Sequence, residues 1–182
     1  MSASNINHNL NNKFMALIPS LEKNQIEEMI KEIYETFEKE TGKVPEWVKV
    51  MAHRPEILKE FTELFKTVMG GGRIESFLKW KIALVVSQTL KCPFCVDVTE
   101  KMLNKMGVSE ETIKKIRELT DEEKEISELV KDVTLDGHLD QPELFEKLKE
   151  KFNEAQIVEI ISVMGLFNYI NRFNNTLGIL PE

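Results

Sequence analysis

The stretch Leu78–Ile113, LKWKIALVVSQTLKCPFCVDVTEKMLNKMGVSEETI, contains both cysteines of the chain and the apolar segment that leads into them. The middle of that segment, IALVVS, is apolar on all sides, which is typical of a central helix packed all round. A buried strand has a similar composition, but the helical pattern on both flanks and the total length favour a helix. Cys92 follows directly, and Pro93 suits the first turn of a second helix that runs to about Lys105. We therefore predict a central helical hairpin that carries the CxxC pair.

Apolar residues recur at steps of three and four along nearly all of the remaining chain, as on one face of a helix. The first such stripe follows Asn24, a cap-like residue with Glu27 three positions later. Arg54-Pro55 breaks the pattern, and so does the run Gly70–Gly72, which we interpret as a hinge between helices. No segment alternates convincingly as a strand would. The predicted fold class is therefore all-α, with about eight or nine helices.

The helical pattern continues to the C-terminus without a break that would mark a domain boundary. Ser109 caps a short helix, and Asn153 with Gln156 caps a last long one. The first residues are polar and rich in asparagine, which indicates a loose segment. We predict one helical domain over residues 15–182, preceded by a flexible N-terminal arm over residues 1–14.

The composition is that of a globular protein, with 42% hydrophobic and 30% charged residues in 182. The formal net charge of −7 argues against a nucleic-acid partner, because phosphate binding needs a basic surface. The longest apolar run, IVEIISVMGLFNYI, is too short to span a membrane and is interrupted by Glu159 and Asn168. The N-terminus lacks the basic-then-apolar order of a secretory signal. We therefore expect a cytoplasmic protein without membrane or nucleic-acid partners.

The cysteine pair has the spacing of a redox site. Thiol chemistry proceeds through the thiolate, so a reactive cysteine needs a lowered pKa. Cys92 is predicted at a helix cap, where free backbone N–H groups favour negative charge, and Cys95 lies one turn further on the same side. Lys91 and Lys101 are expected to add positive charge nearby, and Phe94 to offer an apolar surface for a partner. On these grounds Cys92 is the more acidic and more exposed thiol.

The pair also has two plainer interpretations. Cysteines are often simply core residues, so the spacing can arise by chance. Half of a zinc site is less favoured, because structural zinc needs four nitrogen or sulfur ligands. The histidines His8, His53 and His138 form no ligand pair with the cysteines. We predict a redox pair with no bound metal.

The hairpin stretch resembles the core of the carboxymuconolactone decarboxylase superfamily, in its AhpD-like alkylhydroperoxidase branch. That branch has a helix of small and aliphatic residues leading into CxxC, then a helix that ends at a glycine. The resemblance extends to VPEWVKVMAHRPEILKEF upstream and FNEAQIVEIISVMGLFNYINRF downstream, and so covers roughly Val44 to Leu180. It implies an AhpD-like multi-helix fold and an oligomer, from trimer to hexamer.

The resemblance also implies a chemistry, the reduction of hydroperoxides by the thiol pair, which a partner then reduces again. Carried over, Cys95 is the attacking thiol and Cys92 resolves the disulfide, which is the opposite of the order favoured by cap position. The family also has a glutamate twelve residues before the first cysteine and a histidine four after the second. Those positions hold Trp80 and Thr99 here. Neither side chain is a base at neutral pH.

Without these two relay residues, two functions stay open. The first is a thiol–disulfide oxidoreductase or weak alkylhydroperoxidase, with His53 as a possible substitute base and a protein or small thiol as reductant. The second is a non-catalytic AhpD-like scaffold or small-molecule binding protein, in which Trp80 fills space on the central helix. A ring-opening decarboxylase is disfavoured, because the chain has no paired histidines to handle a lactone. No fingerprint for a flavin, nucleotide or phosphate is present, so no cofactor is predicted.

Overall fold

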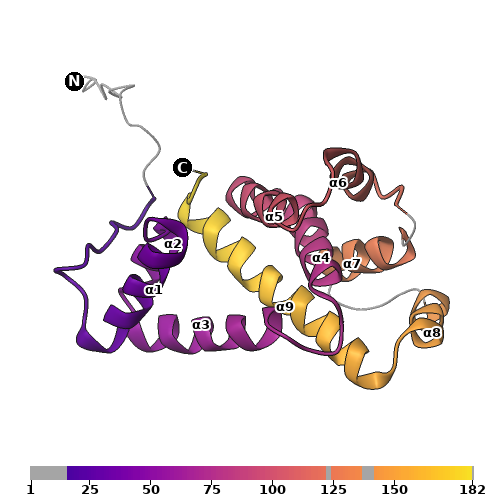
Figure 1. Cartoon of the computed structure of the whole chain (residues 1–182), viewed down its shortest axis with the longest axis horizontal. Helices are drawn as coiled ribbons and strands as arrows, with labels where there is room; N and C mark the ends of the chain where they lie inside the picture. The colour runs from indigo at the N-terminus through magenta and orange to yellow at the C-terminus, as the bar shows by residue number, and fades with distance from the viewer. Residues whose placement is uncertain (1–15, 122–123, 137–141, 182) are drawn as a thin grey trace, which may run out of the picture.

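The computed structural model describes residues 16–121, 124–136 and 142–181, and within these ranges it contains helices and no strand (Figure 1). The predicted arm, residues 1–14, lies outside the described residues. In chain order the elements are η1 (Glu28–Ile30), α1 (Lys31–Thr41), α2 (Glu46–Met51), α3 (Pro55–Met69), α4 (Ser76–Thr89), α5 (Pro93–Lys105), α6 (Glu110–Arg117), α7 (Lys124–Asp136), α8 (Pro142–Lys151) and α9 (Glu154–Leu177). The all-α prediction is confirmed.

Helix α4 is the centre of the fold. Every residue from Leu78 to Ser87 is buried, which confirms the prediction from its all-round apolar sequence. It packs most extensively against α5, α9 and α7. The predicted helical hairpin is the α4–α5 pair, with the cysteines at the turn between the helices.

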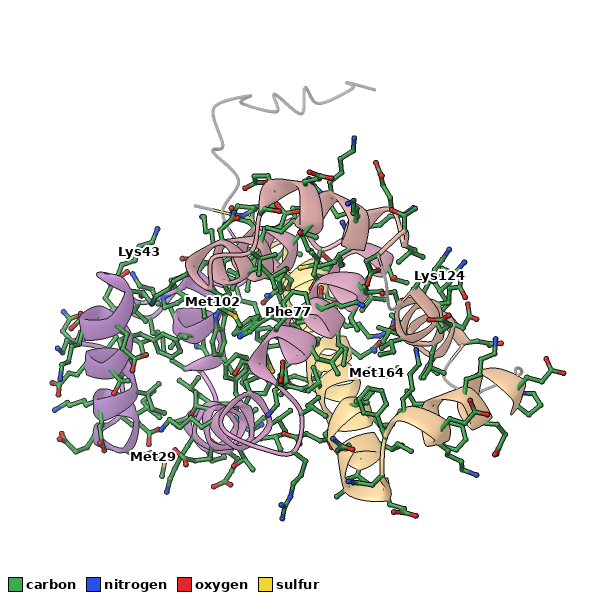
Figure 2. All side chains as sticks on the ribbon, turned by 45° about the vertical axis from the view of Figure 1, so that its right-hand side comes forward. Met29, Lys43, Phe77, Met102, Lys124 and Met164 are labelled. Atoms are coloured by element: carbon green, nitrogen blue, oxygen red, sulfur yellow. The ribbon has the colours of Figure 1, made fainter. Side chains whose placement is uncertain are left out.

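Helix α9 is the second organising element and runs across the whole molecule (Figure 1). Helices α1, α2 and α3 lie on one side of it, and α6, α7 and α8 lie on the other. The side-chain view shows Lys43 and Lys124 projecting from opposite sides of the surface (Figure 2). Met164 of α9 is buried, with 1% of its surface exposed. This long helix therefore joins the N-terminal and C-terminal halves of the chain.

Two lysines of α4 are buried with their charges compensated. The Lys79 ammonium group donates to the Val68 carbonyl at 2.8 Å and to the Gly70 carbonyl at 2.7 Å, and it forms an ion pair with Glu159 of α9. Lys81 forms an ion pair with Asp121, which precedes α7. A buried charge destabilises a fold unless it is paired and hydrogen-bonded. These contacts therefore fix α4 against α9 and against the start of α7.

The loop that follows the glycine run is hydrogen-bonded to α9, and the interpretation of Gly70–Gly72 as a hinge stays a prediction. Glu159 accepts the backbone N–H of Arg73 at 2.5 Å and of Ile74 at 3.2 Å. A Cβ atom on Gly72 would lie 1.8 Å from the Glu159 carboxylate. A side chain at this position would therefore force the carboxylate or the loop to move.

The start of the first helix also differs from the prediction. Asn24 and Glu27 do not cap it, because the chain forms a turn and then the 3₁₀ helix η1 before α1 begins at Lys31. The other predicted caps are confirmed. The Ser109 side chain accepts the Thr112 N–H, and Asn153 and Gln156 form a complete capping box at the start of α9.

Candidate thiol site at the turn between two helices

The turn between α4 and α5 places the cysteines. Lys91 adopts a left-handed conformation with φ of 54°, and the Cys92 N–H donates to the Ser87 carbonyl at 3.0 Å. Cys92 is the N-cap of α5, as predicted, and Pro93 occupies its first turn. The chain thereby reverses direction within a few residues, and the Cys95 side chain lies against α9, where it contacts Asn174.

The two sulfur atoms lie 2.8 Å apart, and both cysteines are free thiols. The Cys92 sulfur also accepts the backbone N–H of Cys95 at 3.4 Å, as a capping side chain does. Only 4% of Cys95 and none of Cys92 is exposed. The pair is therefore close enough to share a proton and is shielded from bulk water.

The environment separates the two thiols by acidity. A hydrogen bond from Cys95 lowers the pKa of Cys92, and two backbone N–H groups of α5 act in the same direction against the effect of burial. The pKa of Cys95 is raised by the same shared hydrogen bond, by burial and by the charge of Cys92. Cys92 is therefore the more acidic thiol of the pair, and Cys95 the less acidic one. This agrees with the acidity expected from cap position.

Three other expectations about the pair are wrong. Cys92 is not the exposed thiol, since its sulfur is fully covered. Lys101 lies in an ion pair with Asp97 at 2.6 Å, and no lysine contributes to the lowered pKa of Cys92. Phe94 is 9% exposed and packs over the sulfurs, so it does not offer a docking surface.

The cover over the sulfurs is apolar and comes from distant parts of the chain. Val50 of α2, Phe94 and Ile179 form a buried cluster with the two cysteines. The segment before α1 lies close by, because the Leu17 N–H donates to the Leu177 carbonyl at 2.8 Å. Partly buried residues pack against this cluster: Ala16, Trp47, Val98, Phe173 and Leu177. A molecule that reaches the sulfurs must therefore pass an apolar cover, which favours apolar molecules over ions.

The two relay positions do not provide a proton acceptor. Thr99 is fully buried, and its hydroxyl donates to the carbonyls of Cys95 at 2.8 Å and Val96 at 3.0 Å. The Trp80 ring packs against those of Phe65 and Phe167, with centroids 6.4 and 6.0 Å apart. Both residues are thus occupied in packing and in helix hydrogen bonds.

His53 lies at the end of α2, is exposed, and has its Nε2 atom 2.8 Å from the Pro19 carbonyl. That contact joins α2 to the segment before α1. Its proposed role as a substitute base stays a prediction.

A row of asparagines on α9 reaches the site, and the sequence prediction missed it. The Asn174 amide donates to the Cys95 sulfur at 3.3 Å. One turn earlier, Asn171 donates to the Ser87 hydroxyl at 3.3 Å, and Asn175 donates to the Leu90 carbonyl at 2.8 Å. Asn171 and Asn174 continue the buried face of α9 beyond Phe167. Asparagine at such core positions was the available signal.

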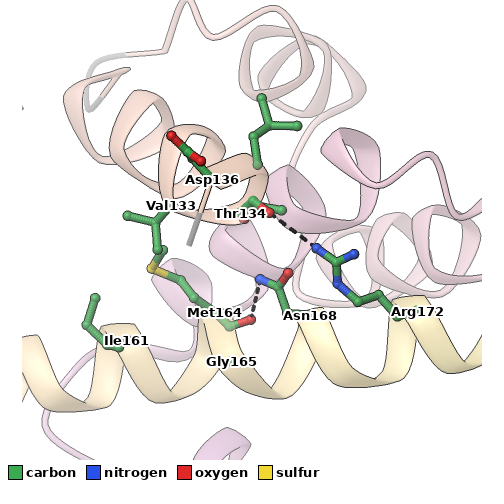
Figure 3. A pocket seen from close by; sticks show the side chains of 9 residues that line it. Val133, Thr134, Asp136, Ile161, Met164, Gly165, Asn168 and Arg172 are labelled. Carbon is green, nitrogen blue, oxygen red and sulfur yellow. Dashed lines mark hydrogen bonds between the residues drawn. The ribbon is translucent and has the colours of Figure 1, made fainter. Parts of the chain in front are cut away.

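A separate hollow of about 330 Å³ lies between α7 and α9 (Figure 3). Its wall combines apolar residues such as Ile161 and Met164 with Arg172, which donates to the Thr134 carbonyl at 3.5 Å. Neither cysteine lines it. Over the described part of the chain, no cluster of histidine, cysteine and carboxylate residues is arranged to hold a metal ion, and none of the helices has the length and apolar character to cross a membrane.

Comparison with known proteins identifies the family. The sequence profile of the carboxymuconolactone decarboxylase family matches residues 55–122, from α3 to the start of α7. YdfG, an uncharacterized protein of Bacillus subtilis (strain 168), is 30% identical over 104 residues, which cover 53% of this chain and 71% of YdfG. The chain belongs to the carboxymuconolactone decarboxylase family. Within that family, the region matched by the profile includes the cysteine pair.

Solved structures show an AhpD-like fold for this family member. A peroxidase-related protein with an alkylhydroperoxidase AhpD core, from Ralstonia eutropha JMP134, superposes with a TM-score of 0.81 at 20% identity over 92% of each chain. The debrominase Bmp8, solved in complex with 2,3,4-tribromopyrrole, has a TM-score of 0.75 at 20% identity over 91% of each chain. A debrominase and an uncharacterized peroxidase-related protein therefore share the fold, and the chemistry of this chain has to be argued from its own site.

Proposed function

We propose that this protein is a thiol–disulfide oxidoreductase that reduces organic hydroperoxides through Cys92 and Cys95. The observation that carries the proposal is the pair itself, with sulfurs 2.8 Å apart and their pKa values moved in opposite directions. A thiolate beside a thiol supplies both a nucleophile and a proton donor. The apolar cover supports an organic oxidant that is small enough to enter.

The reaction balances within the pair. The Cys92 thiolate attacks the terminal oxygen of the hydroperoxide, the O–O bond breaks, and the Cys95 thiol gives its proton to the departing alkoxide. The products are an alcohol, a sulfenic acid on Cys92 and a thiolate on Cys95. That thiolate then attacks the Cys92 sulfur, forming the disulfide and releasing hydroxide, which takes a proton from solvent to become water.

The order of attack proposed here is the reverse of the order that the resemblance implied. Cys92 is at the N-cap of α5, where the backbone N–H of Cys95 points at its sulfur. Cys95 is one turn further and has a raised pKa. A nucleophile must be ionised, so Cys92 is the better candidate and Cys95 resolves.

The missing relay bears on the expected rate. A positioned general acid or base contributes about 10²–10⁴-fold in rate. With Trp80 and Thr99 at the relay positions, Cys95 is the proton donor that this pair offers. We expect oxidation to be slow compared with that of a site in which a base deprotonates the nucleophile.

The disulfide must be reduced again, and we propose a dithiol of a partner protein or a small thiol in the cytoplasm as the electron donor. We also propose that the chain forms a homo-oligomer, from trimer to hexamer. Exposed apolar side chains on α9 support this, among them Val158, Ile161 and Tyr169, which lie on one face. Light scattering of wild type and Ile161→Glu tests it, with loss of the oligomer as the expected result.

A second candidate is a non-catalytic AhpD-like scaffold or a small-molecule binding protein. It is supported by the complete burial of Cys92 and by the aromatic packing of Trp80, which closes the relay position. On this reading, replacing both cysteines by serine leaves the biological phenotype unchanged.

Thiol counting separates the two candidates. The reduced protein is mixed with one equivalent of cumene hydroperoxide, and free thiols are measured over minutes. The proposed function predicts the loss of both thiols, and Cys95→Ser should instead accumulate a trappable sulfenic acid on Cys92. If both thiols persist in the wild type, the peroxidase proposal is wrong and the non-catalytic scaffold or binding protein is favoured.

A further inference from the structure

The carboxamide of Asn174 is the one polar side chain found within hydrogen-bond reach of the cysteine sulfurs among the described residues. It is fully buried, and its amide nitrogen donates to the Cys95 sulfur at 3.3 Å. Its oxygen Oδ1 is also buried and has no hydrogen-bond partner within the described chain. The site therefore contains an unused acceptor next to the sulfur pair.

Such an acceptor is unfavourable for folding. A buried carboxamide oxygen loses its hydrogen bonds to water and gains nothing in return. Leucine has a similar size and shape and would suit the apolar cluster around the cysteines, which includes Ile179 and has Phe173 packed against it. A polar side chain that destabilises the resting protein is typical of a group that acts on a ligand.

We propose that Asn174 orients the hydroperoxide for attack. Its Oδ1 accepts the hydrogen bond of the hydroperoxide O–H group, and thereby holds the terminal oxygen beside the sulfur pair. A hydroperoxide has one such donor, on the oxygen that the thiolate attacks. The inference rests on the proposed function and names the residue that selects the reacting oxygen.

The amide nitrogen of Asn174 has a second effect in the same reaction. When the Cys95 thiol gives its proton to the alkoxide, the N–H group that already points at the Cys95 sulfur stabilises the new thiolate. The carboxamide takes up no proton itself, so it does not replace a base. It positions the oxygen and supports the resolving thiolate.

Asn171 provides a matched control on the same helix. It is also fully buried, and its Oδ1 also lacks a partner among the described residues. Its amide, however, donates to the Phe167 carbonyl at 2.6 Å and to the Ser87 hydroxyl at 3.3 Å, one helical turn from the cysteines. Residue type, burial and helix are therefore matched, and the amide donates to oxygen acceptors in Asn171 but to a sulfur in Asn174.

The test compares Asn174→Leu and Asn171→Leu with wild type in two reactions of the fully reduced chain. Oxidation by cumene hydroperoxide needs a thiolate and an oriented O–H group, whereas alkylation by iodoacetamide needs the thiolate alone. We expect Asn174→Leu to slow oxidation about tenfold or more, to change alkylation by less than about threefold, and to keep or raise the melting temperature. Asn171→Leu should leave the ratio of the two rates unchanged.

Other outcomes overturn the inference. These are an unchanged oxidation rate in Asn174→Leu, an equal fall in both rates, or the same selective loss in Asn171→Leu. If leucine prevents folding, Asn174→Ala is judged by the same ratio. The failure of the proposed function is visible separately, because wild-type thiols then persist in hydroperoxide and no variant is needed to see it.

Discussion

Helix α9 has two buried polar regions that differ in how completely their groups are satisfied. Near its start, Glu159 pairs with Lys79 and accepts two backbone N–H groups, and Lys79 donates to two carbonyls. Near its end, the side-chain oxygens of Asn171 and Asn174 have no partner among the described residues, and the Asn174 amide contacts one of two free thiols. The first arrangement compensates every charge and stabilises the fold. The second leaves groups available, which is where chemistry is expected.

The largest effect is expected from breaking the compensated region with Glu159→Gln. Lys79 is then left buried with its charge unpaired, and removing one partner of a buried pair costs about 3–5 kcal/mol. Urea unfolding measures the change. Glu154→Gln, at an exposed position in the first turn of α9, is the control and should change little.

The same variant has a defined pH dependence. Burial opposes ionisation of Glu159, but the hydrogen bonds from Lys79 and the Arg73 N–H outweigh it and lower its pKa. A carboxylate with a lowered pKa stabilises the fold above its unfolded pKa, and this contribution is lost as the pH falls through the folded pKa. The stability difference between wild type and Glu159→Gln should therefore shrink in acid. A difference that grows in acid would contradict the pairing.

The next largest effect on stability is expected at Gly72, which lies against the Glu159 carboxylate. Gly72→Ala places a Cβ atom 1.8 Å from Glu159, so either the loop or the carboxylate must move. Overpacking of this kind typically costs about 1–3 kcal/mol. Gly71→Ala is the control, because a Cβ there meets no atom within 4 Å. Equal stability of the two variants would mean that the carboxylate moves away without loss.

At the cysteine site near the end of α9, the pKa of Cys92 should depend on Cys95. Cys95→Ala removes the hydrogen bond that is the largest cause of the lowered pKa, so the pKa of Cys92 should rise. The midpoint of iodoacetamide labelling against pH reports it. Cys95→Ser keeps an O–H donor and should show a smaller rise. Identical midpoints for the two variants would place the cause in the helix cap instead.

The smallest effect is expected in the apolar cluster that covers the cysteine sulfurs. Ile179 is buried on the cysteines, and Ile179→Val removes one methylene group, at a cost of about 0.5–1.5 kcal/mol. If the substitution lowers the free energy of the local opening that exposes Cys92 by this amount, labelling of Cys92 becomes faster by up to about tenfold. Ile161→Val, at an exposed position of α9, should leave labelling unchanged. A rate unaffected by Ile179→Val would show that reagents enter by another route.

The parts of the fold that sequence predicts here are those set by local pattern. The all-round apolar IALVVS gives the central helix, and Cys92-Pro93 gives the cap of the next one. The start of α1 was placed too early, because a turn and η1 come before it despite the cap-like Asn24. Capping residues favour a helix start near them. Tertiary packing determines the residue at which the helix begins.

The candidate site was predictable only in part. The pair follows from the spacing, and the direction of the Cys92 pKa shift agrees with the cap position, although the hydrogen bond from Cys95 is its largest cause. The cover by Val50 and Ile179, and the contact of Asn174 with sulfur, join residues far apart in the chain. The exposure of Cys92 was mispredicted for the same reason, since a cap position says nothing about which distant segments lie over it.

The position of Cys92 at the first turn of α5 has a consequence for the redox balance of the protein. The helix stabilises the thiolate, and a thiolate exists only in the reduced form. In the proposed reaction, whatever stabilises the reduced form makes the disulfide easier to reduce, and so a stronger oxidant toward an electron donor. By linkage, oxidation removes a favourable interaction from α5. In the disulfide form the hairpin gains a covalent cross-link but loses the interaction between the α5 N-terminus and the thiolate. Its gain in stability should therefore be smaller than a cross-link alone would give, and the order of α5 should depend on whether the cysteines are reduced or oxidised.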